Sequence, residues 1–499
     1  MIKLPKNDKI NYEEFEDIVE VNKGIPYFKI LVGGEWVMGE SFVEVKSPLT
    51  LNTIAMVSRA DLELANRALE AATATKEKMK NLPGAKRIDI MENAARILSD
   101  RKETMIKALV SNVGKPRSEA EGEVKSTIDR LLSARYDANR IKGDLIPGEW
   151  ANQNQGRIAM VEREPVGVVL AISPFNYPLF ISYTKVIPGL IAGNSVILKP
   201  PSAVPIPALM MARILDEAGI PKGAYSNIVA RGDIASYLAT SDHINMITFT
   251  GSTSVGLELS NISGIKKIHL ELGGKASAIV TKGAKNIQKV AKSIVDGSFK
   301  FSGQRCDAIS RVLAESTVAP QLVESIVNEA KKFRLNMPEE SPLPIGPLID
   351  QSSAERVKGL IDDAIARGAK LILGGKINKN YVEPTVLSDV PLTARIMWEE
   401  TFGPVIPIHN YFTEDEAIEI SNKSEYGLDS AVFTDDITEA LRIARKIEAG
   451  EVTINAFPAH GIGFFPFGGV KQSGFGREGI GFSIDEFTNM KTIVISTAE

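Results

Sequence analysis

The chain contains a single cysteine, Cys306, in the stretch Phe-Ser-Gly-Gln-Arg-Cys-Asp at residues 301–307. Its neighbours Arg305 and Asp307 are charged, whereas a cysteine that only fills space in a core favours apolar neighbours. A nearby guanidinium favours the thiolate, which is the nucleophilic form of the side chain. These residue types predict a reactive thiol, and the alternative is a leftover thiol in a turn.

Two more side chains could take part in the chemistry of a thiol. Glu271 lies in the apolar stretch 269–274, where a carboxylate is costly unless it is paired or neutral, and burial would raise its pKa towards the range of a general base. The alternative is a structural glutamate whose carboxylate is satisfied by Lys275 or by backbone amides. Asn176, in Pro-Phe-Asn-Tyr-Pro at 174–178, could donate to an oxyanion, or it could bond its own backbone in a turn.

The elements that must position these residues follow two patterns. Apolar residues at helical spacing predict helices over residues 60–142. Short β-type runs then alternate with helical stretches, which predicts a parallel sheet covered by helices, an architecture typical of nucleotide binding. The expected strands are 166–172, 195–198, 227–230 and 244–249.

A second alternating region at 279–452 contains Cys306 and predicts a second α/β domain, with helices near 285–300, 320–333 and 352–367. The segment after Lys142 predicts a protruding hairpin, with a solvated linker as the alternative. A β-type tail is expected at 491–496.

A glycine-bounded loop, Gly251 to Gly256, follows one of the expected strands. Such a loop at the start of a helix can hold a phosphate. The usual Gly-x-Gly-x-x-Gly fingerprint is missing, and strand-to-helix turns are often rich in glycine for steric reasons alone.

The length and composition exclude several functional classes. A chain of 499 residues predicts two or three domains, and its net charge of −4 argues against nucleic-acid binding. One cysteine cannot form an intrachain disulfide, which favours a reducing compartment. The N-terminal residues lack the apolar core of a signal peptide, and no run is long enough for a membrane span. The four histidines are widely separated, so we expect a cytoplasmic protein without a metal site.

Seven short motifs occur in an order that resembles the aldehyde dehydrogenase superfamily over nearly the whole chain. They are Phe-Asn-Tyr-Pro at 175–178, Leu-Lys-Pro-Pro at 198–201, Phe-Thr-Gly-Ser at 249–252, Glu-Leu-Gly-Gly-Lys at 271–275, Gly-Gln-Arg-Cys at 303–306, Glu-Glu-Thr-Phe-Gly-Pro at 399–404 and Pro-Phe-Gly-Gly at 466–469.

The resemblance implies an α/β fold with a Rossmann-type cofactor domain, an α/β catalytic domain and a small β oligomerisation element. We expect the cofactor domain at 1–142 and 164–271, and the catalytic domain at 272–475. The inserted hairpin at 143–163 and the tail at 476–499 would form the oligomerisation element. The family suggests a homotetramer built as a dimer of dimers.

The resemblance also implies a mechanism in which Cys306 attacks an aldehyde to give a thiohemiacetal. Asn176 and the backbone N–H of Cys306 would stabilise its oxyanion. Hydride transfer to a nicotinamide would leave a thioester, and Glu271 would activate water to hydrolyse it.

By the same resemblance, Lys199 contacts the adenosine ribose, Ser252 the pyrophosphate and Glu400 the nicotinamide ribose, with Gly251 and Phe402 also at the cofactor. NAD-preferring members usually carry a glutamate at the position of Ser202, where a carboxylate would repel a 2′-phosphate. Serine removes this repulsion, so we expect NADP, with NAD as a possible second cofactor.

Arg305, together with Phe-Asn-Tyr-Pro-Leu at 175–179 and Asn-Lys-Ser-Glu-Tyr-Gly-Leu at 422–428, resembles the non-phosphorylating glyceraldehyde-3-phosphate dehydrogenases. In that branch Arg305 and Tyr177 would hold the phosphate of glyceraldehyde 3-phosphate. The chain departs from the branch at His460, where bacterial members carry an arginine, and a further basic ligand is matched only approximately, by Lys125. Lactaldehyde, glyceraldehyde and succinate semialdehyde therefore stay open as substrates.

Two other classes of function are compatible with the resemblance. A member that had lost catalysis could persist as a binding or structural protein, but Asn176, Glu271, Cys306 and Glu400 are all present. A member could instead pass the acyl group to coenzyme A, and Glu271 argues against this because such relatives often lack the base.

Overall fold

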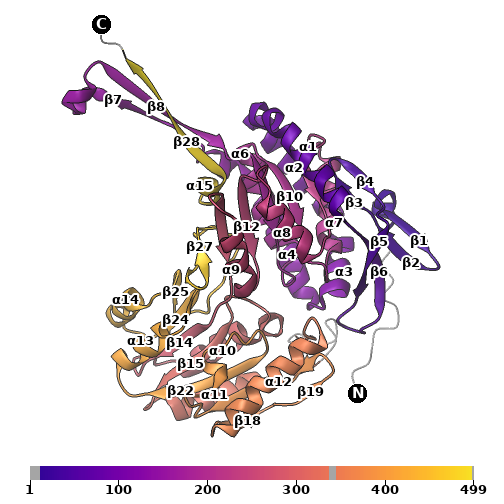
Figure 1. The fold of residues 1–499 in the computed structure, drawn as a ribbon. Helices are drawn as coiled ribbons and strands as arrows, with labels where there is room; N and C mark the ends of the chain where they lie inside the picture. The colour runs from indigo at the N-terminus through magenta and orange to yellow at the C-terminus, as the bar shows by residue number, and fades with distance from the viewer. Residues whose placement is uncertain (1–11, 336–343, 497–499) are drawn as a thin grey trace.

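The computed structural model describes residues 12–335 and 344–496. The chain forms two α/β bodies, one above the other in Figure 1, and a long β arm that projects from the upper body. The N-terminal stretch in which we expected no signal peptide and the end of the predicted tail lie outside the described residues. Among the described residues, no helix combines the length and the apolar character needed to cross a membrane.

The upper body is built on an eight-stranded sheet whose five central strands are parallel. Strand β9 comes first in the chain among these five and lies in the middle, with β10 on one side and β12 on the other. The carboxyl ends beside β9 are therefore a topological switch point, where open α/β sheets bind ligands. The strand order is β27 (Gly474–Phe475), β13 (Lys267–Glu271), β12 (Met246–Thr250), β9 (Val168–Ile172), β10 (Ser195–Lys199), β11 (Tyr225–Asn227), β3 (Ile30–Val32) and β4 (Glu35–Val37).

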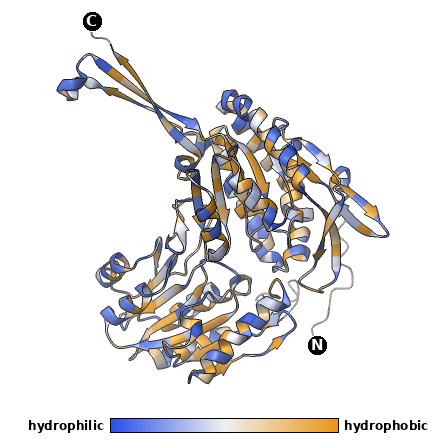
Figure 2. Cartoon of the chain, in the orientation of Figure 1, coloured by the Kyte–Doolittle hydropathy of each residue, from blue (hydrophilic) through white to orange (hydrophobic). Residues whose placement is uncertain are grey.

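Helices cover this sheet with their apolar stripes, and Figure 2 shows hydrophobic residues concentrated along the inner strands. The side chain of Asp61 accepts from the backbone N–H of Leu64 and so fixes the start of the first helix. The prediction of helices over 60–142 is confirmed. The helices are α1 (Leu62–Asn81), α2 (Gly84–Asp100), α3 (Lys102–Val113), α4 (Arg117–Leu132), α5 (Ala134–Ala138), α6 (Phe180–Ala192), α7 (Ile206–Glu217), α8 (Gly232–Thr240) and α9 (Thr253–Ile262).

The lower body is the predicted second α/β domain. Its seven-stranded sheet runs β18 (Lys370–Leu373), β21 (Thr385–Ser388), β22 (Val405–Tyr411), β15 (Ile309–Glu315), β14 (Ala276–Val280), β24 (Asp429–Phe433) and β25 (Glu451–Ile454). All neighbouring pairs are parallel except β18 with β21. The three predicted helices are observed, and five helices pack here: α10 (Ile287–Phe299), α11 (Ala319–Ala330), α12 (Gln351–Ala366), α13 (Glu414–Asn422) and α14 (Ile437–Lys446).

The arm joins the predicted hairpin to the predicted tail. Strands β7 (Asp144–Pro147) and β8 (Arg157–Pro165) form the hairpin, and β28 (Thr488–Ser496) pairs antiparallel with β8 along its whole length. Both elements are longer than we expected, because each satisfies the backbone groups of the other. A short helix, α15 (Ser483–Phe487), leads into β28.

Two parts of the upper body differ from the predictions. The strand expected at 227–230 is observed as β11, Tyr225–Asn227, because Val229 leaves the ladder and its carbonyl accepts from the backbone N–H of Ala60. The sequence reasoning also missed a four-stranded sheet before α1. It consists of β1 (Val19–Asn22), β2 (Ile25–Phe28), β6 (Thr53–Arg59) and β5 (Ser41–Lys46).

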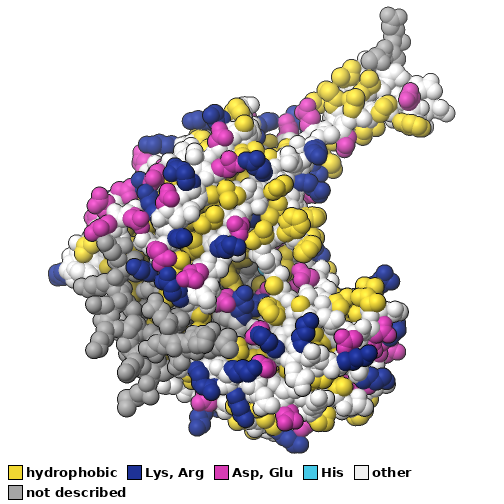
Figure 3. Space-filling view, turned by 180° about the vertical axis from the view of Figure 1, so that it is seen from behind, with side chains coloured by type: hydrophobic (Ala, Val, Ile, Leu, Met, Phe, Trp, Pro, Cys, Tyr) yellow, Lys and Arg dark blue, Asp and Glu magenta, His cyan; other side chains and the backbone are white. Residues whose placement is uncertain are grey.

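On the face shown in Figure 3, side chains of both charge signs are interspersed, and hydrophobic side chains gather along the arm. Within residues 12–335 and 344–496, no group of three or more His, Cys, Asp or Glu side chains could hold a metal ion.

Candidate active site

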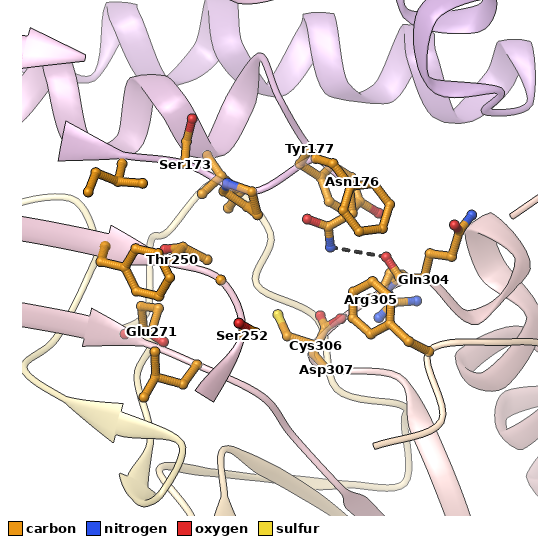
Figure 4. A pocket seen from close by; sticks show the side chains of 18 of the residues that line it. Ser173, Asn176, Tyr177, Thr250, Ser252, Glu271, Gln304, Arg305, Cys306 and Asp307 are labelled. Atoms are coloured by element: carbon orange, nitrogen blue, oxygen red, sulfur yellow. Dashed lines mark hydrogen bonds and ion pairs between the residues drawn. The ribbon is translucent and has the colours of Figure 1, made fainter. Parts of the chain in front are cut away.

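A cavity of about 1080 Å³ lies between the two bodies, at the carboxyl ends of the central strands of the upper sheet. Cys306, Glu271 and Asn176 all line it, although they come from three distant segments of the chain. Figure 4 shows Asn176 above Cys306 in the view, with Glu271 on the side of Cys306 opposite to Arg305. The cavity therefore brings together the three residues to which the resemblance gives catalytic roles.

The loop that carries Cys306 is held in an unusual backbone conformation. The residues Phe301, Ser302 and Gly303 have φ angles of 48°, 54° and 72°, a left-handed run that costs of order 1–3 kcal/mol for each non-glycine residue. Buried hydrogen bonds hold this conformation, because Ser302 Oγ donates to the carbonyl of Gly346 at 2.9 Å and Gln304 Oε1 accepts from the backbone N–H of Ile349 at 2.9 Å. The loop therefore presents Cys306 on a rigid support.

The environment of the thiol favours its protonated form. Burial is the largest cause that raises the pKa of Cys306, and the carboxylates of Asp307, Asp429 and Glu271 raise it further. Arg305 lowers this pKa, as expected from the sequence, but the other contributions outweigh it. The guanidinium therefore acts on the thiol in the predicted direction, but it does not lower the net pKa of Cys306.

Glu271 ends strand β13, and its carboxyl group is only 4% exposed. Burial raises the pKa of Glu271 well above its usual value, and the nearby carboxylate of Glu478 raises it further. Neither carboxyl oxygen has a hydrogen-bond partner among the described residues, so Lys275 does not satisfy it. Lys275 instead donates to Thr401 Oγ1 at 2.8 Å. Glu271 thus has the buried, unpaired character that a general base requires.

Asn176 follows β9 in the loop that leads to α6. Its Nδ2 donates to the carbonyl oxygen of Gln304 at 3.0 Å, so the amide reaches across to the thiol loop and does not cap its own turn. The carboxylate of Glu123 anchors the start of α6, because its Oε1 accepts from the backbone N–H groups of Leu179 and Phe180 at 3.0 and 3.1 Å. This anchor fixes the loop that presents Asn176.

Five of the residues expected at the cofactor line the same cavity: Lys199, Gly251, Ser252, Glu400 and Phe402. Burial lowers the pKa of Lys199 to about 8, and its ammonium group donates only a long hydrogen bond of 3.4 Å to the carbonyl of Pro200. An incompletely satisfied buried ammonium group at a strand end suits an anionic or hydroxyl-rich ligand. Glu400 Oε1 accepts from the backbone N–H of Gly274 at 3.2 Å.

Ser202 lies at the edge of this region and is not among the residues that line the cavity. Its hydroxyl donates to the carbonyl of Ala230 at 3.1 Å and leaves its oxygen available as an acceptor. The position therefore carries neither a negative charge nor a second cation.

Three of the residues predicted to hold a substrate phosphate, Arg305, Tyr177 and His460, line the cavity together. Arg305 is only 4% exposed, and its Nε donates to Asp307 Oδ1 at 2.9 Å while its Nη2 donates to the carbonyl of Pro458 at 3.0 Å. Its Nη1 has no partner among the described residues. Arg305 is therefore a buried cation with one free donor, and not a surface arginine.

Tyr177 keeps its hydroxyl proton, because burial raises its pKa well above the usual value. The ammonium group of Lys115 lies 3.7 Å from the centre of the Tyr177 ring and pairs with the buried carboxylate of Glu123. The ring is thus held between a cation and the thiol loop, with Phe301 packed edge-on at 5.9 Å.

His460 is turned towards a carboxylate. Its Nε2 lies 3.1 Å from Glu478 Oε1, and its backbone N–H donates to Asp307 Oδ2 at 3.2 Å. Burial lowers the pKa of His460, but the hydrogen bond and charge of Glu478 outweigh this effect, so the net pKa is raised. Glu478 also pairs with Lys185 at 3.0 Å, so His460 and Lys185 share one carboxylate.

The structure does not bring Lys125 to the cavity. Its side chain is 80% exposed and lies 3.7 Å from Asp129 on the outer face of α4. Glu119, Gly122, Glu123 and Ser126 face the cavity from α4, at the i, i+3, i+4 and i+7 spacing of one helical face. The prediction that Lys125 is a basic ligand of the substrate is therefore wrong. The next residue in the helix, Ser126, faces the cavity instead.

Several buried charged residues around the site were not assigned a role from the sequence. Lys115 with Glu123 and Lys185 with Glu478 form two buried pairs, and the two glutamates line the cavity. The members of the second pair lie far apart in sequence, which hid the partners of Glu478. A charged residue within an apolar stretch, as at Lys185 in 180–192, was the available signal.

The cavity thus combines a thiol, an amide donor, an unpaired buried carboxyl group and the incompletely satisfied ammonium group of Lys199. This combination can form a covalent adduct at a carbonyl carbon, stabilise its oxyanion and deliver water to it.

Comparisons with known proteins agree with this geometry. A sequence model of the aldehyde dehydrogenase family matches residues 36–493. The NADP-dependent glyceraldehyde-3-phosphate dehydrogenase of Streptococcus equinus is 38% identical over 474 residues, which cover 95% of this chain and 99% of that protein. A lactaldehyde dehydrogenase of Methanocaldococcus jannaschii is 37% identical over 472 residues, which cover 94% and 100% of the two chains.

Among solved structures, the NADP-dependent glyceraldehyde-3-phosphate dehydrogenase from Bacillus halodurans C-125, complexed with NADP, superposes with a TM-score of 0.92 at 38% identity. The match covers 94% of this chain and 99% of that one.

Proposed function

Because the chain belongs to the aldehyde dehydrogenase family, as the sequence predicted, we propose that it oxidises an aldehyde to a carboxylic acid with Cys306 as the nucleophile. The observation that carries the proposal is that Cys306, Asn176 and Glu271, from three distant segments, line one cavity. A catalytically inactive binding protein would have no need of a buried, unpaired glutamate beside a thiol.

The chemistry of the residues gives the order of the steps. Cys306, whose pKa is raised, loses its proton to solvent, and the thiolate sulfur adds to the aldehyde carbon to give the oxyanion of a thiohemiacetal. Asn176 Nδ2, which donates to the Gln304 carbonyl in this structure, turns to the oxyanion together with the backbone N–H of Cys306. Glu271 then takes a proton from water, whose oxygen attacks the thioester carbon, and the thiolate leaves.

The residues at the upper strand ends fit a nicotinamide dinucleotide. Lys199 offers an incompletely satisfied ammonium group, Ser252 precedes the N-terminus of α9, and Glu400 stands beside Gly274. When bound, the oxidised nicotinamide supplies the acceptor for the hydride of the thiohemiacetal carbon. The neutral Ser202 supports a preference for NADP, as in the NADP-bound relative, with NAD as the alternative cofactor.

For the aldehyde, we favour D-glyceraldehyde 3-phosphate, which would be oxidised to 3-phosphoglycerate without phosphorylation. The support is the free, buried Nη1 of Arg305 at the cavity, together with the hydroxyl of Tyr177, since a buried donor of this kind suits an anion. A relative at 38% identity is named for this substrate.

A second candidate is an uncharged small hydroxyaldehyde such as lactaldehyde. Two observations favour it: Asp307 already neutralises Arg305 at 2.9 Å, and His460 is occupied by Glu478. The cavity also contains the carboxylate of Glu119, whose nearest cation, Lys300, is 3.7 Å away. The net positive charge available to a phosphate is therefore small.

A screen of the purified enzyme decides between these substrates. D-glyceraldehyde 3-phosphate, D-glyceraldehyde, lactaldehyde and succinate semialdehyde are each assayed with NADP and with NAD, and Cys306→Ser serves as the control. We expect the highest kcat/KM for the phosphorylated triose with NADP, and no oxidation by the variant. A higher kcat/KM for lactaldehyde would select the second candidate, and full turnover by Cys306→Ser would overturn the proposal.

We further propose that the arm, which the sequence predicted as residues 143–163 with the tail at 476–499, serves in a homo-oligomer. Its strands expose apolar side chains, among them Leu145, Ile146, Met490 and Val494, and Trp150 at its tip is 86% exposed. Such a surface on an extended arm supports contact with a second copy of the chain. Sedimentation of the full chain, compared with a Leu145→Asp and Val494→Asp variant, tests this proposal: the variant should be smaller, and an unchanged size would contradict it.

A further inference from the structure

The imidazole of His269 is a close polar neighbour of the carboxyl group of Glu271. Both residues belong to β13, where residues two apart point to the same face of the sheet. The His269 Nε2 and Glu271 Oε1 atoms are 3.4 Å apart, and the two side chains are 3% and 5% exposed. This distance is slightly longer than a usual N–H···O hydrogen bond of about 2.7–3.2 Å, so a small rotation closes it.

The facing atoms of this pair have no other hydrogen-bond partner among the described residues. His269 Nε2 and both Glu271 carboxyl oxygens lack a hydrogen bond to any described residue. The other ring nitrogen, Nδ1, lies 3.1 Å from Thr248 Oγ1, on the paired strand β12. Two glycines close over the pair: a Cβ at Gly468 would lie 2.8 Å from Glu271 Oε1, and a Cβ at Gly476 would collide with the imidazole ring. The fold therefore leaves these two groups facing each other.

We propose that His269 is a positioning residue for Glu271, which it holds in the resting state through a hydrogen bond from Nε2–H to the carboxylate. The inference rests on the proposed role of Glu271 as the base that hydrolyses the thioester. In this arrangement the ring proton is on Nε2, and Nδ1 accepts from the Thr248 hydroxyl 3.1 Å away.

The pair affects catalysis through the ionisation of Glu271. An ionised carboxylate without a donor is costly in a buried site, and the hydrogen bond from His269 lowers that cost. Burial lowers the pKa of His269 to about 3, so the ring stays neutral and donates without carrying a charge. The charged groups that act on the pair from other elements are Lys185, Glu478, Arg477 and Asp429.

During hydrolysis, the proton taken from water goes to Glu271, and His269 keeps its own proton throughout. Removing His269 should therefore raise the pKa of Glu271 and slow the hydrolysis of the acyl-enzyme. Formation of the acyl-enzyme, which does not use Glu271, should be unaffected.

The test uses p-nitrophenyl acetate, an activated ester that acetylates a reactive thiol without cofactor or aldehyde. Release of nitrophenolate reports acylation, and the mass of the quenched full chain reports decay of the acetyl adduct on Cys306, both measured across a range of pH. The variants are His269→Leu, His269→Gln and Thr248→Val. His269→Leu and His269→Gln are each made in the wild-type and the Glu271→Gln backgrounds.

We expect His269→Leu to slow deacylation about tenfold, the effect of losing one hydrogen bond to a charged group, and to move the rising limb of its pH profile about one unit higher. His269→Gln should restore most of the rate, because its amide can donate from a similar place. Thr248→Val should shift the limb in the same direction but less. In the Glu271→Gln background, His269→Leu should have no further effect.

The outcomes separate this inference from the proposed function. If Glu271→Gln itself deacylates at the wild-type rate, the role of Glu271 as base is wrong. If Glu271→Gln stalls, two results overturn only the positioning role of His269. One is that His269→Leu and Thr248→Val leave the rising limb of the pH profile in place. The other is that His269→Leu slows deacylation equally in the wild-type and Glu271→Gln backgrounds. If His269→Leu fails to fold, His269→Gln and Thr248→Val decide the question: an unshifted limb in Thr248→Val overturns the role.

Discussion

The guanidinium of Arg305 offers the sharpest test of the substrate. In the structure, its Nε and Nη2 donate to Asp307 and Pro458, and its buried Nη1 has no partner among the described residues. Arg305→Ala therefore removes one hydrogen bond to a phosphate, about 1.5–3 kcal/mol for a bond to a charged group. At about 1.36 kcal/mol per factor of ten, kcat/KM for D-glyceraldehyde 3-phosphate should fall roughly 10- to 150-fold.

Two side effects of this substitution must be separated from substrate binding. Loss of the cation raises the pKa of Cys306 and slows every aldehyde, so only the ratio between phosphorylated and unphosphorylated glyceraldehyde is diagnostic. Arg305→Ala also leaves Asp307 buried without its partner, which can cost about 3–5 kcal/mol of stability. The double variant Arg305→Ala/Asp307→Ala removes the unpaired charge while it still lacks the guanidinium.

The assay is the ratio of kcat/KM for the two aldehydes in each variant. Arg305→Ala and the double variant should both lose the preference for the phosphorylated aldehyde. Asp307→Asn should increase that preference, because it leaves more positive charge on Arg305 for a dianion. The phosphate assignment is refuted if Arg305→Ala slows both aldehydes equally or if Asp307→Asn leaves the ratio unchanged.

Three further predictions follow from single contacts. Ser202→Glu should weaken NADP more than NAD in a fluorescence titration, since a carboxylate would face the 2′-phosphate; equal weakening would show that residue 202 does not contact it. Lys115→Met should destabilise the chain by about 3–5 kcal/mol in chemical denaturation by leaving Glu123 unpaired, and Lys115→Met/Glu123→Gln should recover most of the loss; no recovery would argue against the pair. Alkylation of Cys306 by iodoacetamide should rise with pH only above the range of a free thiol, and Asp307→Asn should move the curve to lower pH because the Asp307 charge raises that pKa; an unmoved curve would contradict this.

The sequence predicted the architecture because its signals are local and ordered. Apolar periodicity located the helices and strands, and parallel strands bring their carboxyl ends to one edge of a sheet. The order of seven motifs indicated the family, which the comparisons confirm. The lining of one cavity by Cys306, Glu271 and Asn176 is consistent with the roles that the resemblance implied.

The details that differed depend on three-dimensional proximity. The direction of the Cys306 pKa shift comes from burial and from carboxylates such as Asp429, which is more than a hundred residues away in sequence. The adjacent Arg305 and Asp307 act on the thiol in opposite directions, so these two neighbours alone do not give the net shift. The position assigned to Lys125 required the phase of a helix to within one residue, and a step of about 100° placed Ser126 at the cavity instead.

The central claim is that oxidation proceeds through a thioester on Cys306 that Glu271 hydrolyses. The most direct measurement mixes the Glu271→Gln variant with D-glyceraldehyde 3-phosphate, or the best aldehyde of the screen, and NADP, and follows NADPH and the mass of the quenched protein together. The account predicts a burst of about one NADPH per active site, an acyl adduct on the peptide that contains Cys306, and then turnover slowed by roughly 10²–10⁴-fold. Undiminished steady turnover without an adduct, or an adduct on another residue, would contradict it.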